Sequence, residues 1–251
     1  MHYVSRMHFT SRCMADLAGS FSLLKTPAFS GPPAQRDPAV IATVTEMLRT
    51  IEAGGMDAVL RYATDLDHLD SPDVELDEAT IAKSGDHLDP VLREALELGA
   101  ERTQKFATEQ RNRLSDFELE LAPGVRAGHR YVPVSRVGAY LPAGRFPILA
   151  SAFMTVGVAK AAGVPTVLAC SPPQADGAPN PAVLYSAYLS GADRIYVLGG
   201  VQALAAMAFG LLGERPIDML VGAGNAFVAE AKRQCSARCR STSSPVLLRS
   251  P

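Results

Sequence analysis

The sequence predicts an α/β fold: a Rossmann-like parallel sheet domain, preceded by a helical and hairpin part of a second, incomplete α/β domain. The first observation is a charge-poor stretch, residues 138–227, in which 8 of 90 residues are charged and 12 of the chain's 20 glycines lie. The second is an alternation of short β-prone runs with helical segments, repeating at roughly 25–30 residues, which is the spacing of βαβ units with right-handed crossovers. The third is that residues 37–132 have a different pattern, of helices followed by one hairpin.

The predicted strands of the sheet are residues 134–140, 166–170, 194–198 and 218–221. Apart from their first residues, the last three are uniformly apolar, as expected for strands that are covered on both faces. The predicted helices that follow the strands are residues 148–162, 182–190, 202–209 and 226–234. Two helix ends carry clear signals, because Gly163 suits a helix C-terminus and Asn180-Pro181 supplies a capping side chain and a first-turn proline.

The segment before the sheet begins with a helix at Asp37-Pro38 that ends at Gly54-Gly55, followed by a short helix over residues 56–63. Residues 65–77 form an acidic stretch that we expect to be turns, and a long helix then runs over residues 89–111. The acidic stretch contains a cluster of possible metal ligands without a recognisable metal motif, so we interpret it as a solvated loop. The cluster is Asp65, Asp67, His68 and Asp70.

A hairpin is predicted between the long helix and the first strand of the sheet. Residues 117–121 alternate between apolar and polar side chains, turn at Pro123-Gly124 and return through residues 125–132.

In parallel sheets of this kind, ligands bind at the carboxyl ends of the strands. Here these ends carry Tyr140, Ser171, Gly199-Gly200 and the run Gly222-Ala223-Gly224-Asn225. The last two turns lead into helix N-termini, where free N–H groups and the helix dipole suit a phosphate. Phe227 stands where a dinucleotide fingerprint would have its third glycine, so the pattern fits nucleotide binding and equally fits glycines that only permit tight turns.

Composition limits the kinds of partner and cellular environment that we expect for the chain. A formal net charge of −2 gives no reason to expect nucleic acid or an anionic membrane as partner. No apolar run has the length and continuity of a membrane span. The four cysteines lack the spacing of a disulfide framework or a zinc site, which favours a reduced, cytoplasmic protein. They are Cys13, Cys170, Cys235 and Cys239.

Four ordered blocks in the second half of the chain form a specific pattern. They are Val-Gly-Ala-Tyr-Leu-Pro-Ala-Gly at residues 137–144, Ala-Cys-Ser-Pro-Pro at 169–173, Leu-Gly-Gly-Val-Gln-Ala-Leu-Ala-Ala at 198–206 and Gly-Ala-Gly-Asn-Ala-Phe-Val-Ala-Glu-Ala-Lys-Arg-Gln at 222–234. Together these blocks resemble the histidinol dehydrogenase family. Residues 145–147 and 150–152 are more similar to the sulfopropanediol dehydrogenase branch than to enzymes of histidine synthesis.

The resemblance implies a pair of Rossmann-like domains, the second inserted in the first, assembled as an intertwined homodimer. It implies oxidation of a small alcohol to a carboxylate in two NAD-dependent steps, L-histidinol to L-histidine or a related reaction, with a zinc ion holding the substrate. The family's NAD contacts carry over onto Tyr140, Gln202 and Asn225. Ala143 and Ala223 depart from the glycine and proline that the family commonly has in these turns, which would weaken cofactor binding modestly.

We therefore expect four parts. Residues 1–24 are a disordered or misannotated start, 25–133 the N-terminal part of the first α/β domain, 134–234 the Rossmann-like NAD-binding domain and 235–251 an aberrant tail. The family's zinc ligands and its Glu-His acid–base pair lie downstream of the position of Gln234, and the tail fits none of its blocks.

The genetic code suggests an origin for the tail. Read from the third base of the Cys235 codon, degenerate codons for the tail can encode Phe-Gly-Ala-Val-Ser-Val-Asp-Leu-Leu-Ala-Gly-Pro-Thr-Glu-Val, which contains the block Asp-Leu-Leu-Ala-Gly-Pro-Thr-Glu that the family would show next. We interpret the tail as the product of a one-base deletion, real or from sequencing. The alternative is a genuine disordered tail, since Ser, Arg and Pro dominate it.

Three interpretations of function stay open on the sequence. The chain is a damaged copy of an NAD- and zinc-dependent dehydrogenase, inactive alone, or it is a non-catalytic module that binds NAD or pairs with a full-length homologue. The third interpretation is a remnant that does not fold, because the first domain loses its downstream half and exposes apolar surface.

Overall fold

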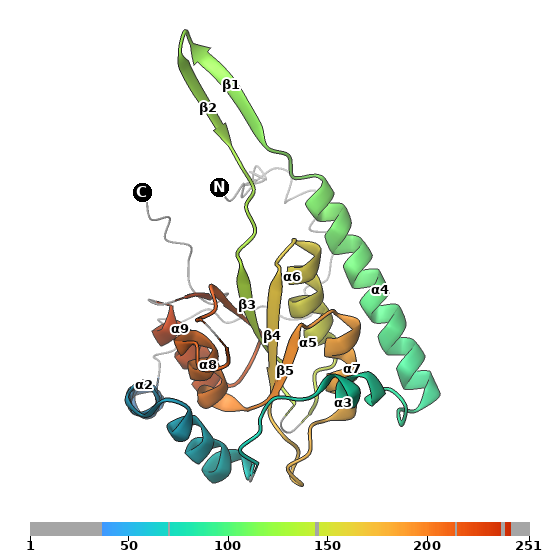
Figure 1. Ribbon diagram of the computed structural model, residues 1–251, viewed down its shortest axis with the longest axis vertical. Coiled ribbons are helices and arrows are strands. Elements are labelled where there is room, and N and C mark those ends of the chain that lie inside the picture. Colours follow the sequence, from blue (N-terminus) through green and yellow to red (C-terminus); the bar gives the residue numbers. More distant parts are fainter. Residues whose placement is uncertain (1–36, 70, 144–145, 214, 237–238, 242–251) are drawn as a thin grey trace, which may run out of the picture. The chain divides into compact units, whose positions relative to one another are not determined.

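A computed structural model gives the structure of the protein and describes residues 37–69, 71–143, 146–213, 215–236 and 239–241. A five-stranded sheet forms its centre (Figure 1). The strands are β3 (Arg136–Tyr140), β4 (Thr166–Ser171), β5 (Arg194–Val197), β6 (Met219–Val221) and β7 (Arg240–Ser241). Their order across the sheet is β5-β4-β3-β6-β7, and every neighbouring pair is parallel. The predicted α/β fold with a parallel sheet is confirmed.

Helical segments follow the strands as predicted, with small differences at their ends. They are the run α5 (Ala150–Ala152), η1 (Phe153–Gly157) and α6 (Val158–Ala161), then α7 (Pro181–Leu189), α8 (Gly200–Phe209) and α9 (Ala226–Cys235). The first run contains a π-helical turn at η1, and the Thr155 hydroxyl in this turn donates a hydrogen bond to the Ser151 carbonyl of α5 at 2.6 Å. Asn180 caps α7 by accepting from the first backbone N–H groups of the helix, as its position before Pro181 predicts.

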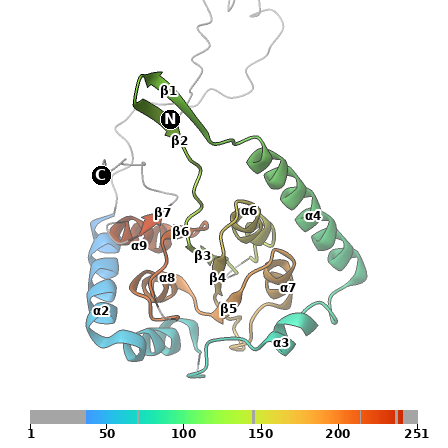
Figure 2. The same cartoon turned by 45° about the horizontal axis from the view of Figure 1, so that its top comes forward.

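Helices cover the two faces of the sheet in separate groups (Figure 2). On one face lie α8 and α9, with α2 (Pro38–Asp67) packed outside them. On the other face lie the α5–η1–α6 run and α7, with α4 (Pro90–Asn112) and α3 (Glu78–Lys83) outside them. A hydrophobic core lies on each face of the sheet, and alternate residues of β3 belong to different cores. Tyr140 packs in the core on the α8 side, whereas Val137 and Ala139 pack in the core on the α6 side.

The segment before the sheet differs from the prediction at two points. The two predicted helices are both present within α2 and meet at a kink where Gly55 is not helical (φ 58°, ψ −143°), but the second one continues past residue 63 to Asp67. The stretch predicted as turns over residues 65–77 therefore begins only at His68. The prediction also missed α3, whose N-terminus is capped by Asp77. This helix has six residues and no buried residue, so it carries no apolar periodicity to detect.

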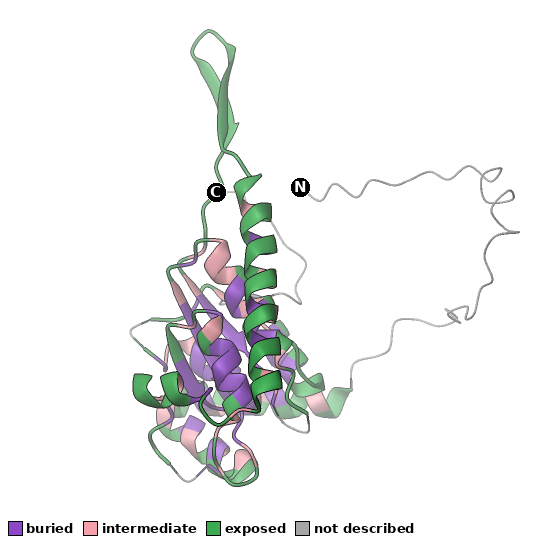
Figure 3. Cartoon of the chain, turned by 90° about the vertical axis from the view of Figure 1, so that its right-hand side faces the viewer, coloured by how far each residue is buried: buried purple, intermediate pink, exposed green. Residues whose placement is uncertain are grey.

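Strands β1 (Phe117–Ala122) and β2 (Val125–His129) form the predicted hairpin, whose second strand ends at His129 and not at residue 132. The hairpin extends beyond the end of α4, away from the sheet (Figure 1). Figure 3 shows that it is exposed along its whole length, in contrast to the buried strands of the sheet.

Most of the two chain ends lies outside the described residues. The predictions for residues 1–24 and for residues 242–251 of the tail therefore fall outside the described residues. Within the tail, Cys235 completes α9, and β7 lies parallel to β6 with Met219 opposite Arg240. In the described part of the chain, no helix combines the length and apolar character needed to cross a bilayer.

Candidate functional site

The order of the strands places a switch point between β3 and β6. From β3 the chain adds β4 and β5 on one side, and α8 then carries it across to β6 on the other side of β3. At such a switch point the connections leave neighbouring strands in opposite directions, which opens a crevice at the carboxyl ends of the strands. Tyr140 ends β3, and the turn that begins at Gly222 follows β6, so both lie at this point.

Gly222 brings this turn into close contact with the backbone of Tyr140. Its φ is +118°, a conformation that side chains disfavour, and a Cβ atom there would lie 2.2 Å from the Tyr140 carbonyl oxygen. Only glycine fits such an approach of one backbone to another. The close approach of the two backbones therefore accounts for glycine at this position, whether or not a ligand binds beside it.

A buried lysine holds the same turn from the other side. Lys232 of α9 is 4 % exposed, and its Nζ donates a hydrogen bond to the Gly222 carbonyl oxygen at 2.7 Å. Burial lowers the pKa of Lys232, because the charged ammonium loses hydration. A side chain of α9 thus fixes the Gly222 turn through one hydrogen bond.

Replacing Lys232 with methionine is expected to change how stability depends on pH. The folded pKa lies below the ordinary value of 10.5, so the folded state binds fewer protons than the unfolded state as pH approaches 10.5 from below. Stability rises with pH wherever the unfolded state binds more protons, so the wild-type chain should gain stability relative to Lys232→Met across this range. Urea unfolding at a series of alkaline pH values measures the difference. The exposed Lys105→Met serves as control, and an equal pH dependence in both variants would contradict the assignment.

Two of the three predicted NAD-binding residues meet in one buried network. Tyr140 is 6 % exposed and Gln202 is 1 % exposed. The Tyr140 hydroxyl oxygen accepts a hydrogen bond from the backbone N–H of Gly200 at 3.2 Å. Gln202 Nε2 donates to Asp67 Oδ2 at 2.8 Å, and the backbone N–H of Gly199 donates to the same oxygen at 3.1 Å. The turn before α8 therefore connects both predicted residues to a carboxylate from α2.

Asn225 lies apart from this network. It is exposed, and its side-chain oxygen caps α9 by accepting from the Val228 N–H at 3.0 Å. Among the described residues, no hydrogen bond joins Asn225 to Tyr140 or Gln202. Tyr140, at the end of β3, and Gln202 of α8 thus meet at the N-terminus of α8, whereas Asn225 lies at the N-terminus of α9 and is not part of their hydrogen-bonded group.

Asp67 is a residue of this network that the sequence did not identify as part of the candidate site. The prediction put it in a solvated loop, but it is the last residue of α2 and is half-buried against the turn before α8. Burial raises the pKa of Asp67, while its hydrogen bonds to Gly199 and Gln202 act in the opposite direction. The acidic composition around it is typical of surface loops, so no local signal separates Asp67 from its neighbours.

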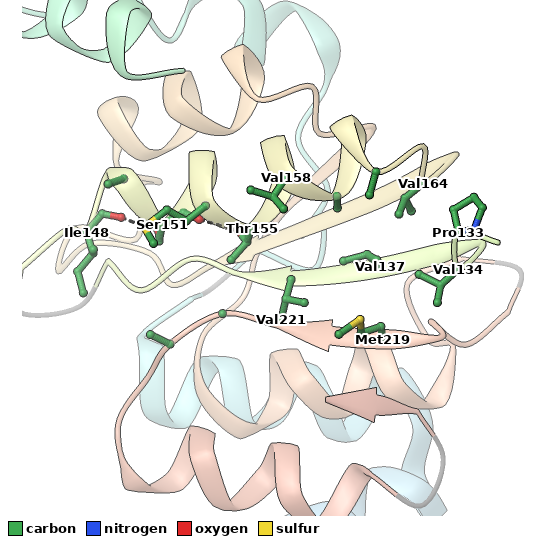
Figure 4. Close-up of a pocket in the computed structure, with 16 residues that line it drawn as sticks. Pro133, Val134, Val137, Ile148, Ser151, Thr155, Val158, Val164, Met219 and Val221 are labelled. Atoms are coloured by element: carbon green, nitrogen blue, oxygen red, sulfur yellow. Dashed lines mark hydrogen bonds between the residues drawn. The ribbon is translucent and has the colours of Figure 1, made fainter. Parts of the chain in front are cut away.

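An apolar groove with a volume of about 650 Å³ lies on the opposite face of the sheet. Figure 4 shows Val137 and Val221 of the strands facing Thr155 and Val158 of the helical run across it. Thr155 uses its hydroxyl group within the helix, and Met154 on the groove wall is 69 % exposed. The groove suits apolar side chains better than a charged dinucleotide, because ligand sites for polar molecules need convergent polar groups.

In the part of the chain that the structure describes, no three side chains of His, Cys, Asp or Glu come together in a way that could hold a metal ion.

Comparisons with known proteins identify relatives of the whole described chain. The family model "Histidinol dehydrogenase" matches residues 32–243. A histidinol dehydrogenase homolog of Ruegeria pomeroyi is 41 % identical over 215 residues, which cover 86 % of this chain and 49 % of the relative. The sulfopropanediol 3-dehydrogenase of the same organism is 43 % identical over 199 residues, or 78 % of this chain and 45 % of that enzyme.

A solved structure agrees with these sequence relatives. The crystal structure of histidinol dehydrogenase from Elizabethkingia anophelis matches with a TM-score of 0.75 and 27 % identity, over 83 % of this chain and 48 % of that one. The chain spans about half the length of the relatives it matches. Because the family model covers most of the sequence and the sheet has the matching architecture, the chain belongs to the histidinol dehydrogenase family.

Proposed function

We propose that this chain is the NAD-binding part of a dehydrogenase that oxidises a small alcohol to a carboxylate in two steps. Membership in an oxidoreductase family supports the reaction class. The relatives include enzymes named for histidinol and for sulfopropanediol, so we propose L-histidinol or a related small alcohol as substrate. A cytoplasmic location belongs to the same proposal. The observation that carries it is the carboxyl edge of the sheet, where two glycine turns lead into α8 and α9.

The residues present fit a dinucleotide at this edge. Gln202 Oε1 is buried and, among the described residues, has no hydrogen-bond partner, so a donor from a ligand would satisfy it. Asn225 is exposed at the N-terminus of α9, where the helix dipole favours a phosphate. Tyr140, Gln202 and Asn225 would hold NAD, and bound NAD would accept hydride from the alcohol. The protein's part in this region is to bind and orient the cofactor beside the switch point.

The resemblance to the family implies that its zinc ligands and its acid–base pair lie downstream of the position of Gln234. We therefore propose that the chain is inactive alone and derive no catalytic step from the described residues. In this proposal the NAD-binding residues and the zinc ligands of the active site come from different parts of the family's polypeptide.

Titration of the purified chain with NAD tests the proposal. We expect saturable binding by calorimetry, weakened about tenfold by Asn225→Ala, because the variant removes a polar contact and the cap of α9. Asn225→Ser keeps a capping oxygen and should also weaken binding if the amide itself contacts the cofactor. Asn180→Ala removes the cap of α7 and is the matched control, which should bind as the wild type does. A folded chain that shows no saturable NAD binding would overturn the proposal.

A second candidate is a non-catalytic fragment that pairs with another copy or with a full-length homologue. The observation that favours pairing is the exposed hairpin, in which Leu119 is 45 % and Leu121 64 % exposed. We propose a homodimer in which the hairpin contacts the second subunit. Isolated two-stranded hairpins are marginally stable in water, so a partner surface would account for the pairing of β1 with β2.

A further inference from the structure

The N-terminus of α8 receives a carboxylate from a helix that is distant in sequence. Asp67 Oδ2 accepts from the Gly199 N–H at 3.1 Å and from Gln202 Nε2 at 2.8 Å, across more than 130 residues of chain. Gly199 is the N-cap of α8 and has no side chain to cap the helix. A negative charge is favourable at a helix N-terminus, so the Asp67 carboxylate stabilises this end of α8 and also accepts from the N–H of the N-cap residue itself.

This arrangement changes what Gln202 can do. Gln202 is the third residue of α8, and a glutamine there commonly turns back to accept a hydrogen bond from the N-cap N–H. Asp67 already occupies that N–H and also binds the Nε2 end of the carboxamide. The carboxamide therefore points its nitrogen at Asp67, and its oxygen is released from capping.

The released oxygen is buried without a donor. Within the described ranges, Gln202 Oε1 is one of three buried side-chain atoms that lack a hydrogen-bond partner, on a side chain that is 1 % exposed. It lies 3.0 Å from the position a Cβ atom of Gly200 would take, at the first turn of α8, where Gly200 has φ +54°. A buried carbonyl oxygen without a donor is costly, which points to a donor that the described residues do not supply.

We infer that Asp67 is the positioning residue that keeps Gln202 Oε1 available to accept a hydrogen bond from a hydroxyl or amide N–H of NAD. The inference rests on the proposed function, since it concerns the same cofactor. Without Asp67, the oxygen of Gln202 turns back to the Gly199 N–H, the helix stays capped, and the cofactor loses its acceptor.

Calorimetric NAD titration of three variants tests this inference. Asp67→Ala is expected to raise the Kd roughly tenfold, the effect of one lost hydrogen bond at a buried group. Asp67→Asn should restore binding to within about twofold, because a single Oδ1 atom can accept from both donors as Oδ2 does now. Asp65→Ala, which removes an exposed carboxylate from the same helix end, is the matched control and should leave the Kd unchanged.

A double-mutant cycle separates positioning from general damage. If Asp67 acts through Gln202, Asp67→Ala should add no further loss in a Gln202→Met background. Circular dichroism and thermal unfolding confirm that each variant is folded. Equal Kd values for wild type and Asp67→Ala, failure of Asp67→Asn to restore binding, or additive losses in the cycle would each overturn the role of Asp67. Absence of NAD binding by the folded wild-type chain is a different result, which overturns the proposed function and this inference with it.

Discussion

Replacing Gly222 with alanine is expected to lower the free energy of unfolding by about 3 kcal/mol or more and to abolish NAD binding. The backbone at Gly222 has φ +118°, which a side chain adopts only under strain, and the new Cβ atom would lie 2.2 Å from the Tyr140 carbonyl oxygen. The Tyr140 carbonyl belongs to a rigid part of the structure, since Tyr140 is the last residue of the central strand β3. The turn must therefore move away from β3, and the N-terminus of α9 must move with it.

Urea unfolding monitored by circular dichroism measures the loss. Gly124→Ala is the matched control, because Gly124 has φ +80° and nothing lies within 4 Å of its added Cβ atom. The control isolates the backbone strain, which should cost about 1–2 kcal/mol at most. If the two variants lose the same stability, the close approach to Tyr140 has no energetic consequence and the account of Gly222 is wrong.

The elements that the sequence predicted correctly are those with local signals. Strands β3 to β6 are short, mostly apolar runs, and α4 and α7 begin at an Asp-Pro and an Asn-Pro pair that cap them as expected. The two-residue strand β7 (Arg240–Ser241) has no apolar signal and was not predicted. Tyr140, Ser171 and the two glycine turns lie at strand ends because the alternation of strand and helix alone fixes where a strand stops. Parallel pairing then follows from the length of the connections.

What the sequence could not show depends on contacts between distant residues. Asp67 becomes part of the candidate site only when α2 packs on α8, and its sequence neighbours Asp65 and Leu66 are exposed. The apolar groove could not be predicted for the same reason. The residues of β6 are apolar, so the sequence predicts a strand that is covered on both faces, whether or not a helix lies over it. Tyr140 and Gln202 were predicted as ligand contacts, and their burial beside Asp67 could be learned only from the folded chain.

The second prediction of large effect concerns the hairpin and the proposed dimer. The hairpin has one polar face, where Glu118 and Arg126 form an ion pair at 2.7 Å, and one apolar face, which includes Leu119. Leu121 follows at the register shift between Glu120 and Ala122 and adds to the exposed apolar surface of the hairpin. Antiparallel sheets commonly pack one face against a core, yet both leucines are exposed in the single chain. An apolar face that its own chain leaves open is a suitable surface for a second subunit.

The double variant Leu119→Lys/Leu121→Lys is therefore expected to convert a dimer into a monomer. Sedimentation velocity at micromolar concentration measures the change directly. The matched control is Glu118→Lys/Arg126→Glu, which also changes two hairpin residues but lies on the opposite face and keeps an ion pair. The control should remain dimeric, because ion pairs between exposed side chains contribute little whichever way they run. A wild-type chain that sediments as a monomer, or a lysine variant that stays dimeric, would show that the apolar face of the hairpin does not hold two subunits together.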